Sequence, residues 1–423
     1  MSLDLAAVRA QFPLLQRTIN GQPLVYLDSA NTSQKPASVI DAMTTFLQHS
    51  YGPINRSAYQ LASEATDAYE GARTKVRHFI NARRDHEVVF TKNATEALNL
   101  VAASWGRANL QSGDVVVLTH MEHHANIVPW HMLAAERGIE LRWVPLTADG
   151  QLDLTDLPQL LDGAKAFSFT AMSNVLGTIT PVRELCAAAH AAGAIAIVDG
   201  CQYVPHNVTD VQAWDADFLA FSSHKMCGPS GVGVLWGKEA LLDAMPPFLG
   251  GGNMIADVRF DGFTTAPLPA KFEAGTPPIV EVVGLGAAVD FLQGLGMANV
   301  RAHELDLTTF IKEGNLYAAV RVADPSEPGV EFPTGKYRVV TTSLLGYGST
   351  AERRPRGNAT MRQQTEIIDR ILERIGEPAH VVGHSFGGMA ALVHEIEGAI
   401  KPASLVLVEA NPFGLLKTSG ELG

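Results

Sequence analysis

The 423-residue sequence has only three cysteines, Cys186, Cys201 and Cys227, separated by 15 and 26 positions. They are too few for a disulfide framework and too far apart for paired metal ligands. Basic residues are also scarce, because 32 Lys and Arg against 44 Asp and Glu leave a formal net charge of -12. The sequence therefore predicts no nucleic-acid partner and no attraction to an anionic membrane surface.

Long apolar runs are missing as well. None approaches the roughly 18 to 20 residues that a membrane span needs, and the first residues do not place a basic stretch before an apolar one. We therefore expect a cytoplasmic protein with reduced thiols and no membrane partner. What the sequence does have is 46% hydrophobic residues, over a length that favours two or three domains.

Short apolar runs alternate with longer amphipathic ones from Tyr26 to about Gly237. This α/β pattern predicts a mostly parallel sheet covered by helices on both faces. The predicted strands are 87–90, 115–118, 141–144, 166–170, 194–198, 218–222 and 233–236, and the predicted helices are 95–105, 127–137 and 182–192. Residues 250–278 are rich in Gly, Pro and Thr and predict a long ordered loop, followed by a helix over 281–295.

The pattern changes after Ala302, where a second series of strands and helices begins. Its predicted elements are strands at 337–342, 380–382 and 404–408 and helices at 361–375 and 388–397. The sequence therefore predicts an N-terminal arm (1–22), a large domain (23–305), a junction (306–335) and a C-terminal segment (336–423).

A lysine and an acid follow two of the predicted strands. Lys225 comes directly after Phe221-Ser222-Ser223-His224, where its amine can form a Schiff base, although a lysine in such a place is usually only solvated. Asp199 ends a strand, where ligands bind in α/β sheets, although such an aspartate is also a common helix cap. Together they supply the amine and the ring-nitrogen partner that pyridoxal phosphate needs.

Two further stretches fit the same cofactor. Thr91–Thr95 bridges a strand and a helix, so its backbone amides, including that of Ala94, and the Thr95 hydroxyl can bind phosphate. Simple N-capping by Thr95 is the alternative. His123 and His124 precede another helix. Zinc is the alternative there, but adjacent histidines are expected to point apart and no further ligands complete a site, so we predict no metal.

Seven short motifs occur in a specific order. They are Tyr-Leu-Asp-Ser-Ala (26–30), Asn-Ala-Thr-Glu (93–96), Glu-His-His-Ala-Asn-Ile-Val-Pro-Trp (122–130), Ser-Asn-Val-Leu-Gly-Thr (173–178), Val-Asp-Gly-Cys-Gln (198–202), Ser-Ser-His-Lys (222–225) and Phe-Glu-Ala-Gly-Thr-Pro (272–277). This set resembles the Suf-type cysteine desulfurases, which have the class-V aminotransferase fold. Over about residues 1–305 the resemblance implies a fold-type-I large domain that binds pyridoxal 5'-phosphate.

The resemblance also implies a reaction and partners. The family reaction converts L-cysteine to L-alanine and an enzyme persulfide, whose sulfur passes to an acceptor protein during iron–sulfur cluster assembly. Lys225 matches the Schiff-base lysine, Asp199 the partner of the ring nitrogen and His123 the imidazole stacked on the ring. Matches to the remaining cofactor contacts are Gln202 and Asn174 at the ring oxygen and Thr95, Ser222 and His224 at the phosphate. Thr276 matches a threonine that reaches the neighbouring subunit's phosphate, which implies a homodimer.

The resemblance stops near residue 305. Family members continue with a small domain that carries an arginine for the substrate carboxylate and a loop cysteine that becomes the persulfide. No cysteine follows Cys227, and neither an Arg-x-Gly-x-x-Cys nor a Cys-Arg-Ala-Ser run occurs. Cys201 and Cys227 are not placed like that nucleophile. We therefore expect cofactor binding to survive better than catalysis.

Residues from about 336 to 423 resemble instead the middle of an α/β-hydrolase. Gly383-His384-Ser385-Phe386-Gly387 forms a G-x-S-x-G elbow between a predicted strand and helix, which implies Ser385 as a nucleophile and the Phe386 amide as an oxyanion donor. Glu409 is either the acid of a catalytic triad or only a helix cap. No histidine follows His394 to act as the base of the triad. A serine hydrolase and an inactive remnant or chimera therefore stay open as alternatives.

Overall fold

The computed structural model describes residues 3–19, 21–54, 58–313, 331–333, 338–340, 362–376, 380–384, 391, 394, 398–402 and 404–408. The chain forms two compact units, Met1–Arg301 and Ala302–Gly423. Among the described residues no single helix is long and apolar enough to cross a membrane. Two helices, Ile279–Leu295 and Met297–Thr309, meet the length and composition test only as a pair bent by 71°.

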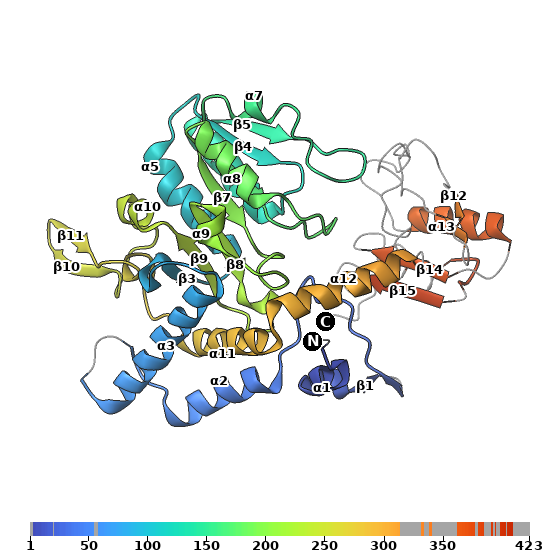
Figure 1. Cartoon of the computed structure of the whole chain (residues 1–423), viewed down its shortest axis with the longest axis horizontal. Coiled ribbons are helices and arrows are strands. Elements are labelled where there is room, and N and C mark those ends of the chain that lie inside the picture. The colour runs from blue at the N-terminus through green and yellow to red at the C-terminus, as the bar shows by residue number, and fades with distance from the viewer. Residues whose placement is uncertain are drawn as a thin grey trace. The chain divides into compact units, whose positions relative to one another are not determined.

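A seven-stranded sheet forms the centre of the first unit (Figure 1), in the order β3-β9-β8-β7-β6-β4-β5. The strands are β3 (Val88–Thr91), β4 (Val115–Thr119), β5 (Glu140–Val144), β6 (Ala164–Thr170), β7 (Ile195–Asp199), β8 (Phe218–Ser222) and β9 (Gly233–Gly237). Strands β4 to β8 are parallel, and β9 is antiparallel to both β8 and β3. The predicted mostly parallel sheet is confirmed, and the carboxyl ends of β3, β4, β6, β7 and β8 share one edge.

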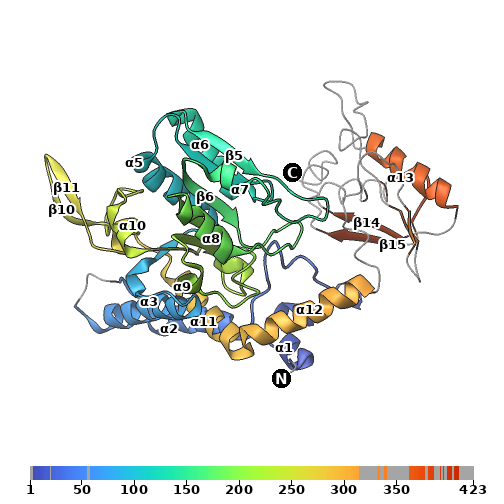
Figure 2. The same cartoon turned by 45° about the horizontal axis from the view of Figure 1, so that its top comes forward.

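Successive residues of the central strands face two different cores. Val198 packs in the core formed with α3 (Gln60–Phe79), α8 (Val182–Ala191) and α11 (Ile279–Leu295). Its neighbour Ile197 packs in the core formed with α4 (Ala94–Leu100) and α6 (Val128–Arg137). Figure 2 shows helices on both sides of the sheet. Both faces are covered, which explains why the strands read as continuous apolar runs.

The other elements of the first unit support the sheet or extend from it. They are α1 (Leu5–Ala10), η1 (Pro13–Gln16), β1 (Thr18–Ile19), β2 (Gln22–Pro23), α2 (Ala37–His49), η2 (Asp85–Glu87), a π-helical segment η3 (Val101–Gly106), α5 (Arg107–Asn109), η4 (His124–Asn126), α7 (Leu157–Leu161), α9 (Val211–Trp214), η5 (Ser223–Lys225), α10 (Glu239–Ala244), β10 (Ile255–Arg259), β11 (Gly262–Thr265) and η6 (Ala270–Phe272). The prediction of a loop over 250–278 is wrong in part, because β10 and β11 form an antiparallel hairpin that projects from the sheet (Figure 1).

Helix α12 (Met297–Glu313) was not predicted, and it runs through residue 305, where we had placed the end of the large domain. In the second unit, α13 (Arg362–Ile375) and the parallel pair β14 (His380–His384) and β15 (Ser404–Val408) agree with the predicted elements. Strand β13 (Arg338–Val340) lies within a predicted strand, but its antiparallel partner β12 (Glu331–Pro333) falls in the stretch predicted as a junction. Most of the predicted helix over 388–397 lies outside the described residues.

Candidate functional site

The carboxyl edge of the sheet brings together the residues predicted from separate motifs. Asp199 is the last residue of β7 and is only 2% exposed. Ser222 is the last residue of β8, and Lys225 ends the short helical turn η5 that follows it. Parallel strands end on the same side, so an acid and an amine that are 26 positions apart in the sequence occupy one end of adjacent strands.

Asp199 and Lys225 both act electrostatically on His123. Burial lowers the pKa of His123, the Asp199 carboxylate opposes this, and the charges of Lys225 and His124 add to it. The Asp199 Oδ1 atom accepts a hydrogen bond of 2.9 Å from the backbone amide of Cys201. The Cys201 thiol has a pKa well above its usual range because it is buried and lies near the Asp199 charge. The site thus contains a held carboxylate, an amine, an imidazole of lowered pKa and a protonated thiol.

The phosphate end of the predicted site lies between β3 and α4. Asn93 caps the helix, since its Oδ1 accepts a hydrogen bond of 2.9 Å from the Glu96 amide. The alternative that Thr95 is only a cap is therefore wrong, and the Thr95 side chain is exposed. The Ala94 amide donates a hydrogen bond of 2.9 Å to Ser222 Oγ, so it orients the serine hydroxyl.

Residues 28–35 fasten the lysine turn to the rest of the domain, which sequence reasoning missed. The His224 carbonyl accepts hydrogen bonds from the Ser33 amide at 2.9 Å and from Lys35 Nζ at 3.1 Å. Ser33 Oγ in turn accepts from the Cys227 amide at 2.8 Å. Burial, together with the Lys225 and Lys35 charges, lowers the pKa of His224. The only sequence signal for Lys35 was its closeness to the Tyr-Leu-Asp-Ser-Ala motif.

Gln202 is tied to the same N-terminal segment, since its Nε2 donates a hydrogen bond of 2.8 Å to the Ala30 carbonyl. Asn174 is half-buried in the turn that follows β6, where the Ser173 amide bonds to the Thr178 carbonyl at 2.9 Å. Both lie in loops that follow strands of the sheet.

A second missed residue is Glu122, a buried carboxyl next to His123. It accepts hydrogen bonds from Thr119 Oγ1 at 2.6 Å, the Thr170 amide at 2.9 Å and Asn126 Nδ2 at 2.6 Å. Burial raises its pKa to about 8 although these hydrogen bonds oppose the shift. Glu122 therefore ties the histidine turn to the ends of β4 and β6.

The two histidines do not point apart as expected, because their ring centroids lie 5.8 Å apart. His123 Nδ1 accepts a hydrogen bond of 3.1 Å from the Ala125 amide, which orients that ring. Within the part of the chain that the structure describes, no three His, Cys, Asp or Glu side chains gather to hold a metal ion.

Thr276 lies apart from this group. It is exposed and lines a cavity of about 370 Å³ with Tyr51, Tyr59, Leu61 and Ile279. The hydrolase-like candidates Ser385, Phe386 and Glu409 lie outside the described residues. In that unit the described His394 is buried and pairs through Nε2 with Asp369 Oδ1 at 2.9 Å.

Residues 25–323 match the family model "Aminotransferase class-V". A probable cysteine desulfurase from Synechocystis sp. is 51% identical over 310 residues, which are 73% of this chain and 74% of that protein. The chain belongs to the cysteine desulfurase family. Residues 316–421 match a second model, "Alpha/beta hydrolase family", so the desulfurase-like part is followed by a region of different similarity.

Two cysteine desulfurases of known structure share the fold of this chain. The structure from Escherichia coli has a TM-score of 0.70 and 38% identity, covering 82% of this chain and 84% of its own. The apo structure from Thermococcus onnurineus has a TM-score of 0.70 and 36% identity, covering 74% and 77%. These matches confirm the predicted family and fold, and they do not favour the hydrolase alternative.

Proposed function

We propose that this chain binds pyridoxal 5'-phosphate at the carboxyl edge of the sheet and accepts L-cysteine there, as its relatives' names indicate for their reaction. The observation that carries the proposal is the position of Asp199, Ser222 and Lys225 at the ends of adjacent strands, with His123 in electrostatic contact with two of them.

The side chains present fit this cofactor. Asp199 is a buried carboxylate that uses one oxygen for the Cys201 amide and keeps acceptor capacity for a protonated ring nitrogen. Ser222 Oγ accepts a hydrogen bond from the Ala94 amide and also interacts with the Cys201 thiol, so the hydroxyl would turn from that thiol to donate to a phosphate oxygen. A Cβ on Gly233 would lie 2.5 Å from the Asn93 backbone, so this glycine lets β9 approach the turn that carries Ala94 and Thr95.

When bound, the cofactor supplies an electron-withdrawing ring that makes the Cα proton of an attached amino acid acidic. Lys225 would attach the cofactor and move the proton at Cα, while Asp199 keeps the ring nitrogen protonated. His123 would stack on the face of the cofactor ring, and Asn174 and Gln202 would contact the ring oxygen. Thr95, Ser222 and His224 would hold the phosphate. These roles are assigned from the motif positions and are supported by the shared edge.

Sulfur transfer lacks an acceptor among these residues. No cysteine follows Cys227 in the sequence. Burial raises the pKa of Cys227 to about 11 and that of Cys201 well above its usual range, so neither is a thiolate at neutral pH. We therefore propose a cofactor-binding desulfurase relative with little or no sulfide release from L-cysteine.

The remaining proposals concern assembly and surroundings. The exposed Thr276 supports a homodimer in which this side chain serves the neighbouring subunit. A sulfur-acceptor protein and a cytoplasmic location follow from the family and from composition, and both stay predictions.

Borohydride trapping tests the proposal directly. Reduction of the protein with added cofactor, followed by peptide mass spectrometry, should place a phosphopyridoxyl group on Lys225. Labelling with a fluorophosphonate in the same preparation tests the alternative. A protein that labels at Ser385 and carries no modification on Lys225 would replace this proposal with a serine hydrolase.

A further inference from the structure

Strand β3 is at the edge of the sheet, where one side of its backbone has no neighbouring strand. Side chains occupy that side instead. The Val88 carbonyl accepts a hydrogen bond of 2.7 Å from Arg73 Nη1, and the Phe90 amide donates one of 2.8 Å to Glu273 Oε1. The two side chains thus take the place of a further strand and close this edge.

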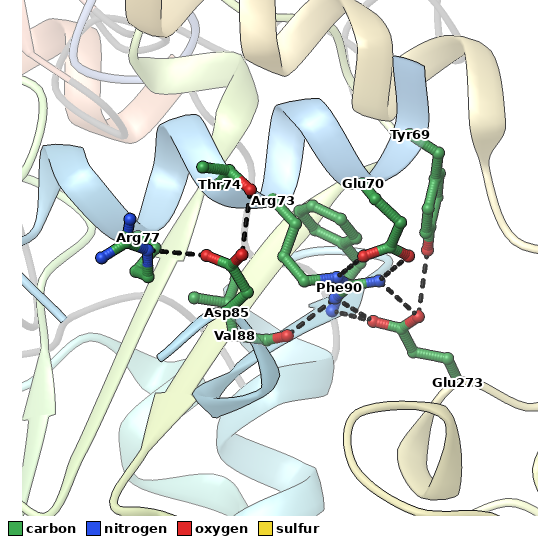
Figure 3. Close-up of polar contacts among 9 residues, drawn as sticks. All are labelled: Tyr69, Glu70, Arg73, Thr74, Arg77, Asp85, Val88, Phe90 and Glu273. Atoms are coloured by element: carbon green, nitrogen blue, oxygen red, sulfur yellow. Dashed lines mark hydrogen bonds and ion pairs between the residues drawn. The ribbon is translucent and has the colours of Figure 1, made fainter. Parts of the chain in front are cut away.

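Arg73 and Glu273 also bind each other (Figure 3). The guanidinium and carboxylate meet in two parallel contacts, Nη1 to Oε1 at 2.8 Å and Nη2 to Oε2 at 3.0 Å. Tyr69 donates a hydrogen bond of 3.1 Å to Oε2, and Glu70 accepts one of 2.8 Å from Arg73 Nε. Arg73 is 1% exposed and Glu273 is 8% exposed. Both charges are therefore removed from water and hold one geometry.

Burial alone would lower the pKa of Arg73, but the charge and hydrogen bonds of Glu273 outweigh it and raise that pKa, so the guanidinium stays charged. A buried ion pair seldom stabilises a fold more than well-packed apolar residues of similar size would. Its advantage is directional, because two parallel hydrogen bonds specify where each partner lies. A contribution to position is therefore the better explanation of this pair than a contribution to stability.

The pair lies at the start of two segments that the proposed function assigns to phosphate. Phe90 leads directly into Thr91–Thr95, and Glu273 is three residues before Thr276. Two more contacts hold the second segment: Asn253 Nδ2 donates to the Glu273 carbonyl at 2.8 Å, and the Gly275 amide donates to the Gly252 carbonyl at 2.8 Å. Arg73 comes from a third element, α3, and contacts β3 at Val88 and Phe90, just before the first segment, and Glu273, at the start of the second.

We propose that Arg73 and Glu273 are positioning residues for the cofactor phosphate. Through one buried ion pair they align the Thr91–Thr95 turn of their own site with the Thr276 segment that serves the neighbouring subunit. This inference rests on the proposed function, because it assumes that both segments bind phosphate.

Comparison of pyridoxal phosphate with pyridoxal, which lacks the phosphate, tests the inference. The full chain is stripped of cofactor and titrated with each compound, following absorbance at 25 °C. In Glu273→Gln the affinity for pyridoxal phosphate should fall by about tenfold to a hundredfold, as for a lost charge-assisted hydrogen bond. The affinity for pyridoxal should change by less than about twofold, because it does not use the phosphate contacts.

Asp290→Asn is the matched control. Asp290, on α11, forms an exposed ion pair with Lys75, which lies on α3, the helix that carries Arg73. This variant should change neither affinity. Tyr69→Phe removes one hydrogen bond to Glu273 and leaves the ion pair, so it provides a milder variant if Glu273→Gln does not fold. We expect Tyr69→Phe to lower the affinity for pyridoxal phosphate by roughly two- to tenfold and to leave the affinity for pyridoxal unchanged.

Equal losses for both compounds, or an unchanged preference for pyridoxal phosphate in the folded variants, would overturn the inference alone. A wild-type protein that binds neither compound would overturn the proposed function, and this inference with it.

Discussion

Glu122 Oε1 accepts a hydrogen bond of 2.9 Å from the backbone amide of Thr170, which joins the turn carrying His123 to the end of β6. The Glu122 side chain is buried, and burial raises its pKa from an ordinary value of 4.5 to about 8. A carboxyl with a raised pKa binds more protons in the folded state than in the unfolded one. Its stabilising effect is therefore fully present below about pH 4.5 and is lost as the pH rises through about 8.

We predict that Glu122→Gln removes most of this pH dependence. A neutral amide can stay in the same hydrogen-bond network if Asn126 turns its own amide, because the Ser168 hydroxyl that now donates to Asn126 at 2.6 Å can accept as well. Between pH 5.5 and pH 8.5, the free energy of unfolding measured in urea should fall by about 3 kcal/mol less in the variant than in the wild type. The exposed Glu136 offers a control as Glu136→Gln. If the free energy of unfolding falls equally in the wild type and in Glu122→Gln, Glu122 is not the source of this pH dependence.

Lys225→Ala should abolish covalent attachment of the cofactor, because its amine is the one placed at the end of β8 beside Asp199. Absorbance near the visible edge, where the lysine-bound cofactor absorbs, measures the loss. Asp199→Ala should keep that band and weaken binding by roughly ten- to a hundredfold, as a charge-assisted hydrogen bond is lost. Unchanged absorbance in Lys225→Ala would show that another amine is used.

Gly233→Ala should destabilise the domain by about 1 to 3 kcal/mol, because its Cβ would lie 2.5 Å from the Asn93 backbone and 2.9 Å from the Ala94 nitrogen. It should also weaken cofactor binding, since the Ala94 amide holds Ser222. Gly294→Ala in α11 is the control, with nothing within 4 Å of the added methyl group. Thermal unfolding measures both variants, and equal melting temperatures for them would contradict the expected clash.

The chain should self-associate through its first 300 residues. Thr276 is exposed, and its family role exists only across a subunit boundary. Light scattering of the cofactor-loaded protein at micromolar concentration should give a dimer mass. A loaded monomer under these conditions would contradict the prediction and would leave Thr276 without its proposed role.

Turnover is expected to be very low. The substrate-clamping arginine motif of the family does not occur in the sequence, and losing such a bidentate ion pair typically costs about 2 to 5 kcal/mol. Sulfide and alanine release from L-cysteine should therefore stay near background although the cofactor binds. Robust alanine production that persists when Cys186, Cys201 and Cys227 are each changed to Ser would show that another group takes the sulfur.

Much of the fold could be predicted because its signals are local. The strands of the central sheet are short apolar runs, and each prediction matches the observed strand to within two residues at either end. The hairpin of β10 and β11 was missed because its strands are largely exposed and carry little apolar alternation. Asn93 and Thr95 are both good caps by residue type, and only the backbone geometry assigns the role to Asn93.

Local sequence patterns were enough to locate the strands along the chain and the residues that follow them, so Asp199 and Lys225 could be assigned to strand ends, and Ser222 followed from the family resemblance. Only the folded structure shows which distant side chains hold the sheet and its connecting turns in place. Arg73 and Glu273 are 200 positions apart, Lys35 and His224 are 189 apart, and Glu122 and Thr170 are 48 apart. No local periodicity encodes such pairs, because a hydrogen bond between distant side chains exists only once packing has brought them within about 3 Å.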